Sequence, residues 1–163
     1  MKEMIAGIFQ IFEKMNIDKH FTQTVAYKQR IFYIEGYNDD KGTSSDLICE
    51  LQATGVKSHI LKELCHMPES RMSHGAEIID DEIFVIGGYG KEDKILSSLV
   101  KIDPRSFKIK AMPPLPHSLA GMATVRWRDE VVFLGGYDDR EILNNVIMFG
   151  CKSGKITLLS PHK

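Results

Sequence analysis

Short apolar runs separated by polar breaks follow one another along the chain. In three places an apolar run, two or three polar residues and a denser apolar run occur in that order, with the breaks at 28–30, 80–82 and 128–130. Apolar runs of this length joined by a tight polar turn are typical of β-hairpins. The second run of each hairpin is apolar at consecutive positions, which predicts a strand that is covered on both faces.

The end of each second run carries a repeated phrase. Residues 83–89 read IFVIGGY, residues 131–137 read VVFLGGY, and residues 31–37 read IFYIEGY with one glycine of the pair. The second glycines, Gly36, Gly88 and Gly136, are 52 and 48 residues apart. A period near 50 residues indicates a repeat architecture. The repeat markers are Gly36, Gly87, Gly88, Gly135 and Gly136.

Two further apolar runs complete each period. The third runs lie at 47–49, 99–102 and 146–149, and the fourth runs lie at 61–64, 109–112 and 156–159. The sequence therefore predicts an all-β protein with four short antiparallel strands in each unit. The first unit has about four extra residues within 52–59, which we expect to form a surface loop.

This register divides the chain into one partial and three whole units. We expect units at 16–67, 68–115 and 116–163, and we interpret 1–15 as the last strand of a preceding unit. The alternative for 1–15 is an amphipathic helix, because its apolar residues also have i, i+3, i+4, i+7 spacing.

Four strands per unit, the period and the double glycine are the pattern of a β-propeller blade. The residues resemble kelch repeats. Arg71 and His74 precede Gly87-Gly88 as an Arg and a His do in that family, Asp103-Pro104 resembles the end of its Tyr-Asp-Pro, and 112–115 resembles its blade-closing Leu-Pro-Pro-Met. The family's Trp position is never Trp here, and the first unit has Glu35 in place of a glycine. The repeats are therefore degenerate copies of the kelch pattern.

Three blades are fewer than the four to eight that usually close a propeller. We therefore expect an incomplete propeller, either a fragment of a longer one or a piece completed by a second copy. Two sheet faces with exposed apolar residues should then remain open, which monomers in water avoid. A truncated product without a function of its own is a further alternative.

The net charge bears on the kind of partner, and the cysteine content bears on the cellular compartment. The net charge is −1 and Lys and Arg are scattered, which indicates neither nucleic acid nor an anionic membrane. No apolar stretch reaches 18 residues and no signal peptide is recognisable. Three cysteines at unrelated spacing, Cys49, Cys65 and Cys151, favour reduced thiols and a cytoplasmic protein.

No motif in the chain predicts catalysis, a metal or a cofactor. Cys65, His66 and His74 lack the spacing of a zinc site, and no Gly-x-Ser-x-Gly elbow or P-loop is present. The acidic pairs at 39–40, 80–81 and 138–139 fit turns. Enzymes similar to galactose oxidase bind copper through Tyr and His. Tyrosine recurs here in each unit together with the repeat, so the repeat explains it without a copper site, and a copper enzyme is the weaker alternative.

The resemblance implies a protein-binding module that is not an enzyme. Kelch propellers serve as the substrate-recognition part of cullin-type ubiquitin ligase adaptors, and others bind actin, so cullin-ligase components and actin are the partners it implies. We expect binding by the loops before the first strand of each unit and by the loops after Gly-Tyr. The candidate contact residues are Arg71, Tyr89, Tyr137, Asp138, Asp139 and Arg140.

Overall fold

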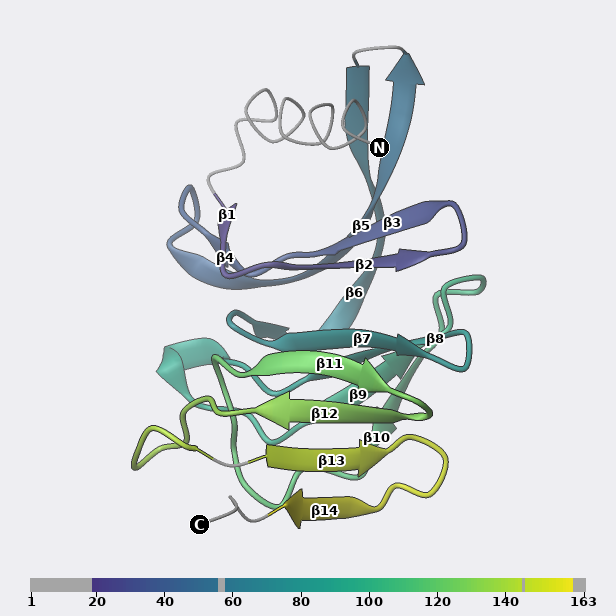
Figure 1. Cartoon of the computed structure of the whole chain (residues 1–163). Coiled ribbons are helices and arrows are strands. Elements are labelled where there is room, and N and C mark those ends of the chain that lie inside the picture. The colour runs from purple at the N-terminus through teal and green to yellow at the C-terminus, as the bar shows by residue number, and fades with distance from the viewer. Residues whose placement is uncertain (1–18, 56–57, 145, 160–163) are drawn as a thin grey trace, which may run out of the picture.

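The computed structural model describes residues 19–55, 58–144 and 146–159, which form three antiparallel sheets (Figure 1). The first sheet contains β2 (Gln23–Tyr27), β3 (Arg30–Ile34), β5 (Thr43–Gly55) and β6 (Ser58–Arg71), with the short strands β1 (Lys19–His20) and β4 (Tyr37–Asn38) at one end. The middle sheet contains β7 (Gly75–Ile79), β8 (Glu82–Ile86), β9 (Leu99–Ile102) and β10 (Ile109–Met112). The last sheet contains β11 (Ala123–Trp127), β12 (Glu130–Leu134), β13 (Val146–Gly150) and β14 (Ile156–Leu159).

The four main strands of each sheet follow the predicted order, and in the middle and last sheets every strand pairs with its neighbour along the chain. The tight turns lie at 28–29, 80–81 and 128–129, as the polar breaks predicted. In the middle and last sheets the fourth strands coincide with the predicted runs. The all-β prediction is therefore confirmed for the described residues, and none of the three sheets closes on itself. The prediction for 1–15 lies outside the described residues.

The prediction for the insertion in the first unit is wrong. The extra residues of the first unit do not form a surface loop, because they lengthen β5 and β6 into a two-stranded ribbon (Figure 1). The pairing continues through Gln52↔Ile60 and Ala53↔His59 to Gly55↔Ser58. In such a ribbon the backbone groups satisfy one another, so the insertion stays within the β-ladder. Pro68 lies in an irregular stretch near the other end of β6, where the register shifts between Ser45 and Leu47.

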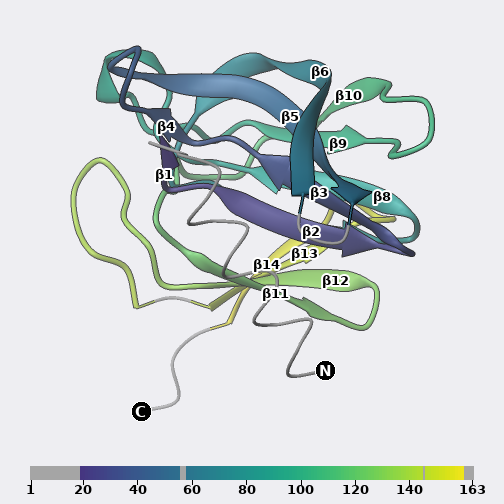
Figure 2. The same ribbon diagram turned by 90° about the horizontal axis from the view of Figure 1, so that it is seen from above.

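The middle sheet lies between the other two, and β7 contacts both β2 and β11 (Figures 1 and 2). We call the face of each sheet that points toward the next sheet in the chain its forward face, and the opposite face its rear face. One core lies between the forward face of the first sheet (Tyr27, Phe32, Ile34, Ile48) and the rear face of the middle sheet (Ile83, Val85, Val100, Ile102). A second core lies between the forward face of the middle sheet (Ile79, Phe84, Ile86, Leu99) and the rear face of the last (Val131, Phe133, Ile147, Phe149). Phe84 and Phe149 meet edge to face there, with ring centroids 6.2 Å apart.

Polar contacts hold neighbouring sheets together at the turn end. Arg30 of β3 pairs with Glu50 and also donates a hydrogen bond to the carbonyl of Pro104, in the turn after β9 (2.6 Å). Lys152, after β13, reaches Asp80 of the middle sheet at 3.2 Å and Asp129 of its own sheet at 3.0 Å. These two contacts link neighbouring sheets directionally, in addition to the apolar cores between them.

The two remaining faces differ. The forward face of the last sheet is open, with Trp127 and Leu134 exposed at 59% and 43%. On the rear face of the first sheet, however, Tyr33 and Cys49 are buried. Ile31, Leu47 and Leu51 on that same face are partly exposed, so the expectation of two open apolar faces is confirmed at the last sheet and holds only in part at the first.

Candidate functional site

The two sets of loops that the sequence singled out meet at one end of the sheets. The segments before β2, β7 and β11 and those after Tyr37, Tyr89 and Tyr137 all lie at this end, opposite the hairpin turns (Figures 1 and 2). We call this the loop end. Because a first strand begins where the second strand ends, an antiparallel meander must bring these loops together. All six candidate contact residues lie at or beside the loop end.

The repeated tyrosine joins the two loop sets through its backbone. Tyr89 and Met72 exchange two hydrogen bonds (2.8 and 2.9 Å), and Tyr137 and Ala120 exchange the same two. In the first sheet Tyr37 pairs with His20. The backbone of the repeated Gly-Tyr thus connects the loop before each first strand to the loop after each second strand. The tyrosine side chains lie at the surface, with Tyr137 exposed and Tyr89 half-buried.

The glycines before the tyrosine permit this connection. Gly87 has φ +57°, and its amide donates to the carbonyl of Ser98 at 3.0 Å. Gly88 has φ +97° and donates to the carbonyl of Leu119, which belongs to the loop before the last sheet (2.8 Å). A Cβ at Gly88 would lie 2.7 Å from the carbonyl oxygen of Met72. These positions need glycine for its conformation and for close approach of the backbone.

Arg71 is fully buried, although the sequence made it a contact candidate. Its guanidinium donates to the carbonyl of Gly87 at 3.0 Å and to the hydroxyl of Ser98 at 3.1 Å, and Glu69 lies 3.5 Å away. Arg71 is the last residue of β6, so these bonds tie the first sheet to the middle sheet. A partner would reach this side chain only after rearrangement of the loops.

Arg71 has a buried neighbour in His74. His74 is 1% exposed, and neither ring nitrogen has a hydrogen-bond partner in the structure. Burial, with a further contribution from the Arg71 charge, lowers the pKa of His74 to about 3. The imidazole is therefore neutral in the folded protein at physiological pH.

The other five candidates gather near the boundary between the middle and last sheets. Burial raises the pKa of the Tyr89 hydroxyl, and the nearby Tyr137 and Asp139 raise it further. Asp138 accepts hydrogen bonds from the amides of Glu141 and Arg140 (2.9 and 2.8 Å), which lower its pKa.

A cleft of about 540 Å³ adjoins this group. The hydroxyl of Ser118 donates to Asp139 at 2.8 Å across it and so connects the loop before β11 to the loop after Tyr137. Arg140 is exposed on its wall and forms no ion pair within the described residues. The cleft thus presents the carboxylates of Asp138, Asp139 and Glu141 and a guanidinium, that of Arg140, without an ion pair among the described residues.

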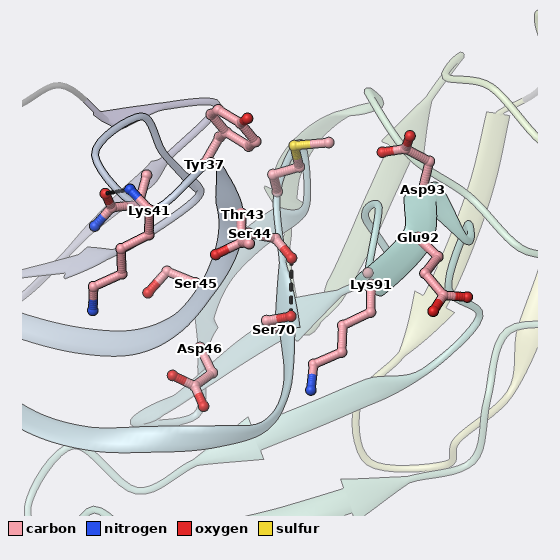
Figure 3. A pocket seen from close by; sticks show the side chains of 14 residues that line it. Tyr37, Lys41, Thr43, Ser44, Ser45, Asp46, Ser70, Lys91, Glu92 and Asp93 are labelled. Atoms are coloured by element: carbon pink, nitrogen blue, oxygen red, sulfur yellow. Dashed lines mark hydrogen bonds between the residues drawn. The ribbon is translucent and has the colours of Figure 1, made fainter.

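A second cleft, of about 620 Å³, lies between the first and middle sheets at the same end (Figure 3). Lys41 and Lys91 extend along its two sides, and Ser44, Ser45 and Ser70 lie between them. The hydroxyls of Ser44 and Ser70 are hydrogen-bonded at 2.9 Å. Among the described residues neither lysine forms an ion pair, so both ammonium groups are available to a ligand.

Acidic groups balance the lysines of this second cleft. Asp46 pairs with His66 at 2.8 Å, and this hydrogen bond raises the pKa of His66. Glu92 and Asp93 follow Lys91 with φ of +55° and +56°, a left-handed conformation that is uncommon outside glycine. The mixed charge suits a partner surface with both signs of charge.

The second cleft contains residues that sequence reasoning missed. Lys41 and Lys91 lie within the loops expected to bind, but neither was singled out. A charged side chain in a loop carries no periodic signal, and the two lysines are 50 residues apart in the chain. Only packing of the first sheet against the middle sheet brings them to one cleft.

The described residues show no centre for metal chemistry. They contain no group of three His, Cys, Asp or Glu side chains arranged to hold a metal ion. Cys65 and His66 do not join His74, because His66 faces Asp46 at the surface and His74 is buried beside Arg71. No helix within 19–55, 58–144 and 146–159 has the length and apolar character needed to span a membrane.

Comparison with known proteins agrees with the repeat and the fold. A family model described as the kelch motif matches residues 70–116. The chain is 28% identical over 152 residues to beta-scruin of Limulus polyphemus, and 24% identical over 127 residues to the spermatocyte protein spe-26 of Caenorhabditis elegans. These matches cover 88% and 77% of this chain but only 16% and 22% of the two relatives. The chain therefore spans less than a quarter of the length of either relative.

A solved structure has the same arrangement of sheets. The structure titled "Structure of YjhT" superposes with a TM-score of 0.71 at 16% identity, over 87% of this chain and 46% of that one. The middle and last sheets are four-stranded antiparallel meanders, the first sheet has four corresponding strands and two short additional ones, and all three are blades of a β-propeller type. Together with the motif matched at 70–116, they show that the chain contains a kelch motif within blades of a propeller type.

Proposed function

We propose that this kelch-repeat chain is a protein-interaction module without enzymatic activity and that its partner binds at the loop end. The observation that supports this most directly is the convergence of both repeating loop sets there. The loop end carries two clefts and the exposed side chain of Tyr137, and within the described part of the chain Arg140, Lys41 and Lys91 form no ion pair. Tyrosine and arginine are enriched among the residues that dominate binding energies.

The two finer possibilities differ in partner. One is the substrate-recognition part of a cullin-type ubiquitin ligase adaptor, in which the loop end would hold the protein to be modified. The other is an actin-binding protein. Both rest on the family resemblance, and the mixed charge of the two clefts suits a folded protein surface with charges of both signs in either case.

The experiment compares two charge reversals of the same sign. Arg140→Glu changes the loop end, and Lys108→Glu changes an exposed residue in the turn before β10, at the opposite end. Proteins retained from cell extract by the purified chain should be lost with Arg140→Glu and kept with Lys108→Glu. If both variants retain the same proteins as the parent, the loop end is not the binding surface.

Two direct assays then distinguish the partners. Co-sedimentation with purified filamentous actin tests actin binding, and it should be lost in Arg140→Glu if actin binds at the loop end. Co-purification of a longer form of the protein with a cullin subunit tests the adaptor role. A chain that sediments with actin but never with a cullin would favour the cytoskeletal function.

A further inference from the structure

The edge strand that ends the first sheet is much longer than the equivalent strands of the other two sheets. β6 has 14 residues, whereas β10 and β14 have 4 each. Within the described part of the chain each of these strands is paired on one side only, with β5, β9 and β13 respectively. Short edge strands are one means by which proteins prevent edge-to-edge pairing, so β6 lacks a protection that its two counterparts have.

Part of β6 is protected in another way. Its pairing with β5 is irregular between residues 63 and 71, and Pro68 in this stretch has no backbone N–H to donate. Between residues 59 and 63 the ladder with β5 is regular, residue for residue. This regular stretch includes Ile60, whose side chain is 49% exposed. The unprotected part of the edge is therefore 59–63.

The hydrogen bonds of the first sheet show which backbone groups of this stretch point outward. The amide of Glu35 donates to the carbonyl of Leu47 at 3.0 Å, so alternate residues of β5, counted from Leu47, bond to β3 and those between them bond to β6. The hydrogen-bonded pairs between β5 and β6 are then Glu50↔Lys62 and Gln52↔Ile60. The residues whose N–H and C=O groups point away from β5 are His59, Leu61 and Glu63.

Two copies of this edge match each other about a two-fold axis. In an antiparallel pair, outward-pointing residues must lie opposite outward-pointing residues. With the axis at Leu61, that residue lies opposite itself, and residue 59 of each copy lies opposite Glu63 of the other. Lys62 then lies beside Ile60 of the second copy, where its aliphatic stem covers the exposed isoleucine. An axis at Lys62 or Glu63 would place like charges opposite each other, which is destabilising.

We propose that the edge formed by residues 59–63 of β6 is a dimerisation surface, to which a second copy of the chain adds its own β6 as an antiparallel strand. The pairing joins two first sheets into one continuous sheet and satisfies the outward backbone groups of both edges. It takes place at a sheet edge, so no sheet face is covered by it. The ribbon of β5 and β6 projects away from the middle and last sheets, which leaves the edge accessible (Figure 1). The edge is distinct from the loop end, so this inference does not depend on the proposed function.

The first experiment compares two leucine-to-lysine substitutions on edge strands. Leu61→Lys places two ammonium groups opposite each other at the axis, whereas Leu159→Lys changes an exposed leucine of β14. Sedimentation velocity of the full chain should show a dimer whose share rises with concentration. The dimer should be lost in Leu61→Lys and kept in Leu159→Lys, and far-UV circular dichroism checks that both variants keep the β-sheets.

The second experiment tests the register by disulfide formation. Two Leu61→Cys chains bring their new thiols together at the axis, so mild oxidation should link them into a covalent dimer. Glu63→Cys is the matched control, because position 63 lies opposite position 59 in this register and should be linked much more slowly. The native Cys65 is farther from the axis, so the parent should stay unlinked under the same conditions.

Three results would overturn the proposal. The first is a parent chain that sediments as a monomer at every concentration, and loss of a co-purifying protein in Leu61→Lys would then assign the edge to a strand of that protein. The second is a dimer that persists in Leu61→Lys, and its loss in Leu159→Lys would place the contact on the last sheet. The third is faster linkage of Glu63→Cys than of Leu61→Cys, which would exclude an antiparallel pair centred on Leu61.

Discussion

The middle and last sheets have nearly the same sequence pattern and very different surroundings. Along β8 four consecutive residues from Ile83 to Ile86 are buried, because the sheet is covered on both faces. Along β12 burial alternates, with Val131 and Phe133 buried and Leu134 exposed. A strand with consecutive apolar residues has apolar side chains on both faces. Whether both faces are covered depends on the neighbouring sheets.

The largest expected effect comes from truncating equivalent residues in the two sheets. Ile86→Ala removes a fully buried side chain from the core between the middle and last sheets and should lower the free energy of unfolding by about 2–5 kcal/mol. Leu134→Ala, at the equivalent position, should lower it by less than about 1 kcal/mol, because the side chain is already exposed. Urea unfolding of both variants measures the difference. Equal losses would show that the forward face of the last sheet is covered in solution.

A second comparison uses the first glycine of the Gly-Gly pair, which is Gly87 in the middle sheet and Gly135 in the last sheet. Gly87→Ala places a Cβ against the carbonyl oxygen of Leu119, in addition to a left-handed backbone, and should cost more than about 2 kcal/mol. Gly135→Ala has the same sign of φ, +62°, but the nearest atom, the carbonyl oxygen of Leu143, is 3.3 Å away. Its cost should be about 1 kcal/mol.

Thermal or urea unfolding of the two alanine variants checks this difference. If Gly135→Ala were the more damaging substitution, the backbone contact with Leu119 would not be what restricts Gly87. A Gly87→Ser variant should lose about as much stability as Gly87→Ala, because the steric conflict begins at the Cβ.

A third expected effect is a pH dependence that originates at His74, in the segment before β7. The pKa of His74 is lowered by burial to about 3 in the folded state and is near 6.5 when the chain unfolds. Between these values the unfolded chain takes up a proton that the folded chain does not. Stability should therefore fall as the pH falls from about 6.5 toward 3, by up to about 1.4 kcal/mol per pH unit.

The variant that tests this pH dependence replaces His74 by the residue found at the equivalent position before the last sheet. Met122 occupies the position equivalent to His74, so His74→Met supplies a side chain that does not titrate. Urea unfolding between pH 4.5 and 6.5 should show a weaker loss of stability on acidification in His74→Met than in the parent. The pKa of His66 is raised by Asp46, which acts in the opposite direction in both proteins, so it cancels in the comparison. An unchanged slope would mean that His74 accepts a proton in the folded state.

Much of the fold could be predicted from the sequence. The polar breaks located the turns, and the apolar runs located the strands, because a strand in a repeated meander needs only its neighbours in the chain. The insertion in the first unit was misjudged because a longer ribbon and a longer loop begin with similar residues. The pairing of Gln52 with Ile60 depends on the bulged register of β5 and β6, which no local pattern specifies.

The candidate site was predicted less completely. Tyr89, Tyr137 and Arg140 could be named from the sequence because they recur with the repeat or follow it, and their role in binding stays a prediction. Lys41 and Lys91 were not, since their proximity depends on how two sheets pack. Arg71 was found by its place in the motif, but burial beside Gly87 could be read only from the structure.

The sequence by itself determined the repeat, the four main strands of each unit and the glycines that end each second strand, because these depend on local patterns of apolar, polar and glycine residues. Tertiary structure decided which apolar faces are covered, where Arg71 and His74 are buried and which loop residues share a cleft. The physical reason is that a side chain on one sheet is buried only where a second sheet packs against the same face. Ile86 and Leu134 occupy the same place in the repeat, and Ile86 is buried while Leu134 is exposed because a neighbouring sheet covers only the first of them.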